Sequence, residues 1–92
     1  MTSTDFNIEH HSKQQRFCIA ISDDTSAVLE YTLLDPQTID FTHTHVPFRH
    51  RGQGHAEALV RAGLAWANAQ GFTIQASCWY VDKFLKQAPN EA

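Results

Sequence analysis

The sequence lacks a surplus of positive charge and lacks any long apolar run. Its 92 residues include seven Lys and Arg against ten Asp and Glu, a formal net charge of −3. Proteins that bind nucleic acid usually carry an excess of Lys and Arg, so we expect no nucleic-acid partner. No segment approaches the ~20 apolar residues of a membrane span, and residues 1–7 lack the basic and apolar regions of a signal peptide. We therefore expect a cytoplasmic protein with no membrane partner.

Cysteine is scarce, and its two positions, Cys18 and Cys78, are far apart. Neither they nor the six histidines show a Cys-x-x-Cys or His-Glu-x-x-His spacing, so we expect no metal site. In a reducing cytosol both cysteines should be free thiols. Each is then either a small buried side chain or a nucleophile.

The length leaves room for one domain with a modest core. An apolar content of 42% and a charged content of 18% are typical of a globular protein. We expect a single domain over residues 1–92, with frayed ends at 1–5 and 88–92. We further expect a monomer or a weak dimer.

Alternation of apolar and polar residues predicts four successive strands. They are expected at 6–11, 16–22, 26–34 and 38–46. In the fourth strand, Ile39 and Phe41 should share a face with His43 and His45. The side chains on that face would change from apolar to imidazole where the strand leaves the core. A bulge there would re-aim the backbone.

A helix follows at 55–70, and Gly71 is the expected residue at its end. Small side chains, Gly63 among them, would let this helix lie close to a sheet. A fifth strand is predicted at 72–78 and a short final helix at 81–86.

The order strand, helix, strand from 38 to 78 predicts a right-handed crossover with two parallel strands. The fold class is α/β (α+β): a mostly antiparallel sheet of about five strands, one parallel crossover and a short C-terminal helix. Ligands of open α/β sheets bind at the carboxyl ends of such strands.

The junction between the fourth strand and the long helix lacks a conventional helix cap. It reads Arg49-His50-Arg51-Gly52-Gln53-Gly54-His55-Ala56. No Ser, Thr, Asp or Asn is present there to satisfy the first N–H groups of the helix. Those donors, the helix dipole and the glycines together make an anion site, and Arg49 and Arg51 can neutralise a diphosphate. The alternative is an ordinary turn whose amides bind water.

Three segments together resemble the GNAT superfamily of acetyltransferases. Read as Arg49-x-x-Gly52-x-Gly54, the loop is similar to the acyl-CoA pyrophosphate motif of that superfamily. Two further segments are similar to its small single-domain branch, often described as minimal acetyltransferases: His43-Thr44-His45-Val46-Pro47 and Ser77-Cys78-Trp79-Tyr80-Val81. The resemblance runs from Tyr31 to Pro89 and departs from the pattern at Ala76, where that branch usually has proline.

The resemblance implies a GNAT-like domain that uses acetyl-CoA. The pyrophosphate would lie on the loop beside the two arginines, and the pantetheine arm would pair with the fourth strand where the fifth splays away. The residues so implied to bind CoA are Thr44, His45, Val46, Arg49, Arg51, Gly52, Gln53, Gly54, His55 and Ala56.

The resemblance also implies catalytic roles. In the minimal branch the cysteine that matches Cys78 is the proposed acetyl carrier, and His43 would serve as its base. The alternatives are a small buried thiol at Cys78 and a hydrogen-bonded structural imidazole at His43. Tyr80 is either a general acid toward the CoA sulfur or a core aromatic residue.

The function that follows is transfer of an acetyl group from acetyl-CoA to a small-molecule or protein amine or thiol. Larger GNAT enzymes build much of their acceptor pocket from helices between the first two strands and from strands after the last helix, and both are lacking here. A non-catalytic CoA-binding or acetyl-CoA-sensing module is the main alternative. A structural protein that binds no CoA is the third.

Overall fold

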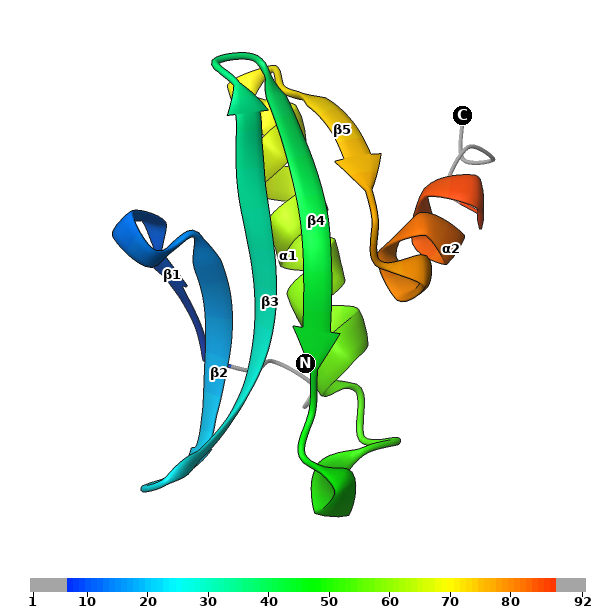
Figure 1. Cartoon of the computed structure of the whole chain (residues 1–92). Helices are drawn as coiled ribbons and strands as arrows, with labels where there is room; N and C mark the ends of the chain where they lie inside the picture. The colour runs from blue at the N-terminus through cyan, green and yellow to red at the C-terminus, as the bar shows by residue number, and fades with distance from the viewer. Residues whose placement is uncertain (1–6, 88–92) are drawn as a thin grey trace.

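In the computed structural model, residues 7–87 are described, and they form a five-stranded sheet with two α-helices (Figure 1). The strands are β1 (Ile8–His11), β2 (Arg16–Ser22), β3 (Thr25–Asp35), β4 (Thr38–His45) and β5 (Thr73–Ala76). The helices are α1 (His55–Gln70) and α2 (Trp79–Gln87), with 3-10 turns η1 (Ser12–Gln14) and η2 (Phe48–His50). The frayed ends predicted at 1–5 and 88–92 lie outside the described residues.

The strands lie side by side in sequence order, from β1 to β5. The first four are antiparallel neighbours, whereas β5 pairs parallel to β4 after the crossover through α1. The predicted fold class is therefore confirmed, with β3 as the central strand. Neither α1 nor α2 combines the length and hydrophobicity that a membrane crossing requires.

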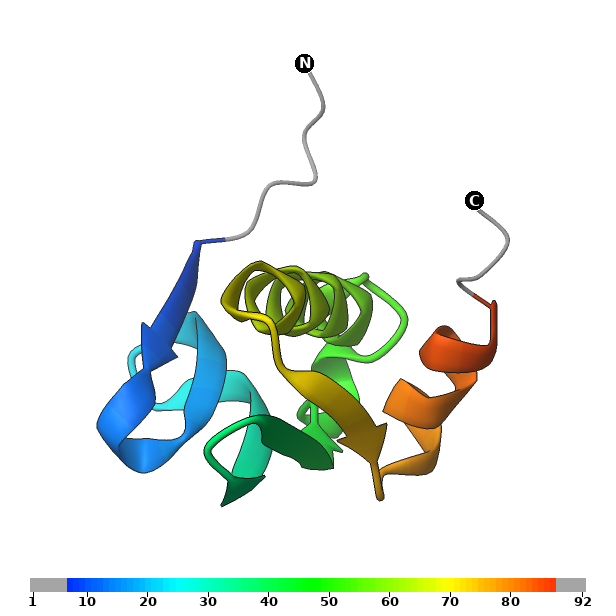
Figure 2. The same ribbon diagram turned by 90° about the horizontal axis from the view of Figure 1, so that it is seen from above.

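Helix α1 packs on one face of the sheet, and the core lies between them (Figure 2). The fully buried side chains that dominate it are Leu29, Ile39, Phe41, Leu59, Val60 and Val81. Within residues 7–87 no helix covers the opposite face of the sheet (Figure 2). As predicted, Gly71 ends α1 in a left-handed conformation, with φ of 81°.

Gly63 marks the closest approach of α1 to the sheet. A Cβ atom built there would lie 2.8 Å from Leu29 Cδ2 and 3.0 Å from Phe41 Cε1. Both neighbours are fully buried, so neither can move aside without disturbing the core. The small side chain at this position is what allows the helix to pack at this distance.

Several element boundaries differ from the sequence-based prediction by one or two residues, and the two beside Cys78 affect the site. β5 ends at Ala76 rather than at Cys78, and α2 begins at Trp79 rather than at Val81. The reason is that the amides of Ser77 and Cys78 both donate to the carbonyl of Phe41, at 3.0 and 3.1 Å. The chain therefore turns away from β4 immediately after Ala76.

The prediction that His43 and His45 share a face with Phe41 is wrong. The register between β3 and β4 shifts at Thr42, so that Phe41 lies opposite Tyr31 whereas His43 lies opposite Glu30. The extra residue reverses the alternation of side chains beyond it. Thr44 and Val46 consequently point to the α1 side of the sheet, and both histidines point to the open face.

We predict that Gly63→Ala lowers the free energy of unfolding by up to about 2 kcal/mol. Overpacking a close-packed core costs ~1–3 kcal/mol, which exceeds the ~1 kcal/mol gained in helix propensity. Urea denaturation followed by circular dichroism measures the difference. Ala65→Gly at an exposed position of the same helix is the control, and it should lose only the ~1 kcal/mol of propensity. A Gly63→Ala variant more stable than the unaltered protein would contradict the packing argument.

Candidate functional site

A cavity of about 510 Å³ opens where the end of β4, the loop before α1 and the start of α2 meet. Its lining residues come from all three: Thr44, Val46, His50, Arg51, Gly52, Gly54, His55, Ala56, Glu57, Cys78, Trp79 and Tyr80. The cavity thus brings together segments more than 30 positions apart in the sequence. It lies at the carboxyl end of β4, where ligands of open α/β sheets usually bind.

The glycine loop at one end of this cavity offers backbone donors. Gly52 and Gly54 have φ of 83° and 96°, a left-handed conformation that side chains rarely adopt. Gly54 is the N-cap of α1 and provides no side-chain hydrogen bond. Among residues 7–87, the amides of Gly52, Gly54 and Ala56 donate no hydrogen bond. The loop therefore has the donors and the dipole of an anion site.

The two arginines of the loop differ in position. Arg51 lines the cavity, and its Nε donates to the carbonyl of Val46 at 2.9 Å. Its guanidinium lies 5.8 Å from the centre of the Phe48 ring. Arg49 and Gln53 are exposed and lie outside the lining residues, so of the predicted cationic pair only Arg51 faces the cavity.

The backbone of β4 is open along one edge beside the cavity. The parallel ladder ends at the pair Phe41 and Ala76, while β4 continues to His45 with β3 as its neighbour on the other side. Beyond Phe41, no strand within the described part of the chain occupies the β5 side. Thr44 and Val46 line the cavity here, whereas His45 does not.

Asp40 fixes the point at which β5 leaves β4, and sequence analysis did not single it out. This 9% exposed carboxylate accepts hydrogen bonds from the Ser77 amide at 2.8 Å and from the Ser77 hydroxyl at 2.7 Å. A carboxylate between Ile39 and Phe41, in the middle of a strand, is the signal that would have found it. The Asp40 carboxylate thereby holds Ser77, the residue immediately before Cys78, in place.

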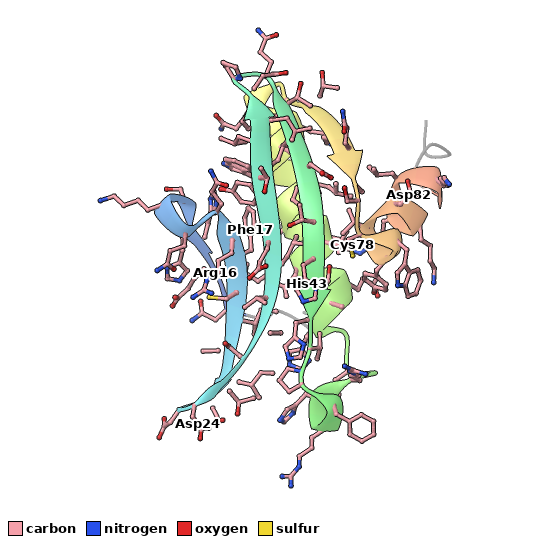
Figure 3. The ribbon with its side chains drawn as sticks, in the orientation of Figure 1. Arg16, Phe17, Asp24, His43, Cys78 and Asp82 are labelled. Carbon is pink, nitrogen blue, oxygen red and sulfur yellow. The ribbon has the colours of Figure 1, made fainter. Side chains whose placement is uncertain are left out.

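Cys78 lies at the other end of the cavity, at the N-terminus of α2 (Figure 3). Its carbonyl accepts the first helical hydrogen bond, from the Asp82 amide at 3.0 Å, and its Sγ is 3.5 Å from Thr44 Oγ1. Burial raises the pKa of the thiol, but hydrogen bonds from Thr44 and from the backbone of Val81 and Tyr80 outweigh it, so that the pKa is lowered. Such a thiol forms a thiolate more readily than an ordinary cysteine.

His43 is not brought to Cys78. It is exposed on the open face of the sheet, where its ring stacks 6.3 Å from that of His45, and it is not among the lining residues. Thr44 occupies the place beside the thiol that the sequence analysis gave to His43. The register shift at Thr42 is the cause.

Two aromatic residues complete the wall beside Cys78. Trp79 is 72% exposed, and Lys83 Nζ lies 5.9 Å from the ring centres of both Trp79 and Tyr80. Burial raises the pKa of Tyr80, Glu57 adds to this, and Arg61 opposes it. The Tyr80 hydroxyl is therefore protonated at neutral pH and can act as a proton donor.

The parallel strands β4 and β5 part beside the uncapped N-terminus of α1. A fold of this kind defines an acetyltransferase-like class of domain. Residues 16–92 match the sequence profile of the GCN5-related N-acetyltransferase family. This match spans well over half of the chain. The chain belongs to the GCN5-related N-acetyltransferase (GNAT) family.

Relatives support this assignment. The chain is 33% identical over 89 residues to Protein NATD1 of Danio rerio, covering 96% of this chain and 81% of that protein. Protein NATD1 of Homo sapiens is 30% identical over 83 residues, with 89% and 74% covered. The solution structure of a GCN5-like protein from Staphylococcus aureus matches with a TM-score of 0.68 at 24% identity, covering 89% of this chain and 79% of that one. This last similarity concerns the fold.

We predict that Cys78 is alkylated by iodoacetamide at lower pH than Cys18. The pKa of Cys78 is lowered, whereas burial and then Glu9 raise that of Cys18 against a smaller effect of Arg16. Thr44→Val should move the Cys78 profile to higher pH, because it removes a hydrogen bond that stabilises the thiolate. Peptide mass spectrometry after timed alkylation measures both thiols in one sample, so Cys18 is the internal control. An unchanged profile in Thr44→Val would argue against the Thr44 contact.

Proposed function

We propose that this protein binds acetyl-CoA in the cavity and transfers the acetyl group, through Cys78, to an amine or thiol acceptor. The observation that carries the proposal is that one cavity joins unsatisfied loop amides to a thiol of lowered pKa. These two features suit two groups of acetyl-CoA: the loop amides suit its diphosphate, and the thiol suits its acetyl thioester. Free thiols at both cysteines accord with a reducing compartment such as the cytoplasm.

The glycine loop suits the pyrophosphate. The amides of Gly52, Gly54 and Ala56 would donate to its oxygens, and the positive end of the α1 dipole would stabilise its charge. Arg51 adds a full positive charge, and its Nε contact with Val46 holds the side chain against the cavity wall. A Cβ at Gly54 would force a strained backbone, which explains why glycine is required there.

The open edge of β4 suits the pantetheine arm. Amide groups of such an arm can pair with backbone groups as an added strand does. Thr44 and Val46 lie on this edge and line the cavity. The arm would thus run from the loop toward α2, with its sulfur end near Cys78.

The chemistry assigned to this chain is acyl transfer. When bound, acetyl-CoA supplies an acetyl thioester. The Cys78 thiolate forms a bond to the acetyl carbon as the bond to the CoA sulfur breaks, and the protonated Tyr80 hydroxyl is on the same cavity wall to return a proton to the departing sulfur. The acceptor amine or thiol would then bond to the acetyl carbon as the bond to the Cys78 sulfur breaks. The proton that the acceptor loses would return to Tyr80, so that Cys78 and Tyr80 are both restored.

The acceptor site is open rather than enclosed. Only the short turn η1 lies between β1 and β2 in the described chain, and Trp79 projects from the cavity wall with most of its surface exposed. An acceptor would therefore approach Cys78 from solvent, past Trp79. Such access suits a side chain or amine on a larger molecule as well as a small one.

We expect calorimetric titration with acetyl-CoA to show saturable 1:1 binding. Arg51→Ala should weaken that binding about 10-fold or more, since a hydrogen bond to a charged group contributes ~1.5–3 kcal/mol. Lys13→Ala removes the same charge from η1, away from the cavity, and is the control. Equal losses in the two variants would mean that net charge alone, not the loop, attracts the ligand. Absence of binding would refute the proposed function.

Incubation with acetyl-CoA should add one acetyl mass to the protein, and hydroxylamine should remove it. Cys78→Ala should abolish this adduct, whereas Cys18→Ala should retain it, because Cys18 lies on β2 outside the cavity. Intact-protein mass spectrometry detects the adduct. Saturable binding with neither adduct nor release of CoA would favour the alternative of a non-catalytic CoA-sensing module.

A further inference from the structure

A second group of reactive side chains lies on the open face of the β1–β2 hairpin, away from the cavity. Glu9, His11 and Cys18 each offer one ligand atom there, and these atoms all lie within 4.8 Å of one another. In the described chain this is the one group of three or more His, Cys, Asp or Glu side chains close enough to share a metal ion. None of the three lines the acetyl-CoA cavity.

The alternation of β1 places these side chains together. His10 points into the core, where its ring stacks 4.1 Å from that of Phe17 and its Nε2 lies 2.7 Å from the Tyr31 hydroxyl. Its neighbours Glu9 and His11 must therefore point to the open face. Because His10 is held on the inner side, the outward direction of its two neighbours is fixed.

The strand register supplies the third side chain. Glu9 lies directly opposite Cys18 on β2, and such pairs have Cβ atoms only ~4.5–5.5 Å apart. His11 Nε2 is already 3.1 Å from Glu9 Oε1. All three groups thus face one point above a paired antiparallel ladder, which is a rigid support.

Their chemistry suits a borderline-soft divalent ion. A thiolate, an imidazole and a carboxylate are the three ligand types of Zn²⁺, and a tetrahedral site with bonds of ~2.0–2.3 Å separates its ligand atoms by ~3.5 Å. The present ligand atoms lie up to 4.8 Å apart, so rotation about the side-chain χ angles would bring them closer on binding. The thiolate and Glu9 together would balance the two charges of the ion.

Arg16 is the charged side chain nearest to the group on β2, opposite His11 in the register. Its charge opposes a bound cation but also favours the thiolate form of Cys18. Across the sheet, Arg16 lies opposite Glu30 on β3, which offsets part of the repulsion. The combined negative charge of the Cys18 thiolate and the Glu9 carboxylate is still larger in magnitude than the positive charge of Arg16.

We propose that Glu9, His11 and Cys18 form a Zn²⁺ site with a fourth position open to water or an external ligand. Binding releases the proton of the Cys18 thiol as the metal–sulfur bond forms. No metal was expected from the sequence because it has no Cys-x-x-Cys or His-Glu-x-x-His spacing, whereas strand pairing brings Glu9 and His11 to Cys18. The bound ion would tie the edge strand β1 to β2 and so stabilise the fold.

The test uses the whole chain, kept reduced with a phosphine, and titrates it with ZnCl₂ and with CoCl₂. We expect one equivalent of Zn²⁺ to bind and Co²⁺ to give a thiolate-to-cobalt charge-transfer band. Cys18→Ser should abolish the band and weaken Zn²⁺ binding at least ~10-fold. Glu9→Gln, at an exposed position, should weaken it while leaving the circular dichroism unchanged. Cys78→Ser is the matched control and should keep both the band and the stoichiometry.

Three results would overturn the proposal. The first is no saturable Zn²⁺ binding to the unaltered chain. The second is a cobalt band that survives in Cys18→Ser and vanishes in Cys78→Ser. The third is Zn²⁺ binding that is unaffected by Cys18→Ser and Glu9→Gln but lost in the double variant His43→Ala and His45→Ala, which would place the ion at the pair His43 and His45.

Discussion

The parting of β4 and β5 after Phe41 and Ala76 is the constraint on which the site depends. The Asp40 carboxylate holds both the amide and the hydroxyl of Ser77, and this contact directs the chain away from β4 one residue before Cys78. The Phe41 carbonyl acts at the same point, because it accepts from the amides of Ser77 and Cys78. Two consequences follow from these contacts. Beyond Phe41, the β5 side of β4 has no strand neighbour among the described residues, and Cys78 is placed at the start of α2, facing Thr44.

The same electrostatic effect acts twice around the cavity. The N-terminus of α1 has no side-chain cap, so its amides and its dipole face the loop end, where we propose that a diphosphate binds. The N-terminus of α2 is capped by the sulfur of Cys78, which the backbone of Tyr80 and Val81 stabilises as a thiolate. Each helix N-terminus thus faces a negative charge, the proposed diphosphate at α1 and the Cys78 thiolate at α2.

Local signals predicted most of the fold, and non-local ones decided the rest. The signals that predict helix α1 and its flanking glycines lie in adjacent residues. The observed bounds of the helix therefore agree with the prediction to the residue. The faces of His43 and Thr44 depend instead on a register shift against β3. The sequence predicted a bulge in this part of β4, but not which side chains the bulge would turn toward α1. The contact of Asp40 with Ser77 and the approach of Glu9 to Cys18 are likewise set by strand pairing. The candidate site was therefore predictable in its loop and its cysteine, but not in the side chains that orient that cysteine.

The most direct test of the account is a two-dimensional ¹H–¹⁵N NMR titration of the labelled protein with CoA. We expect saturable shifts concentrated at the amides of Gly52, Gly54 and Ala56 and along residues 44–46, because those groups would gain hydrogen-bond partners. Signals of the β1–β2 hairpin should stay in place. Saturating CoA that leaves the loop amides unmoved, or that shifts only signals elsewhere in the molecule, would contradict the central claim that this loop is an anion site joined to the Cys78 thiol.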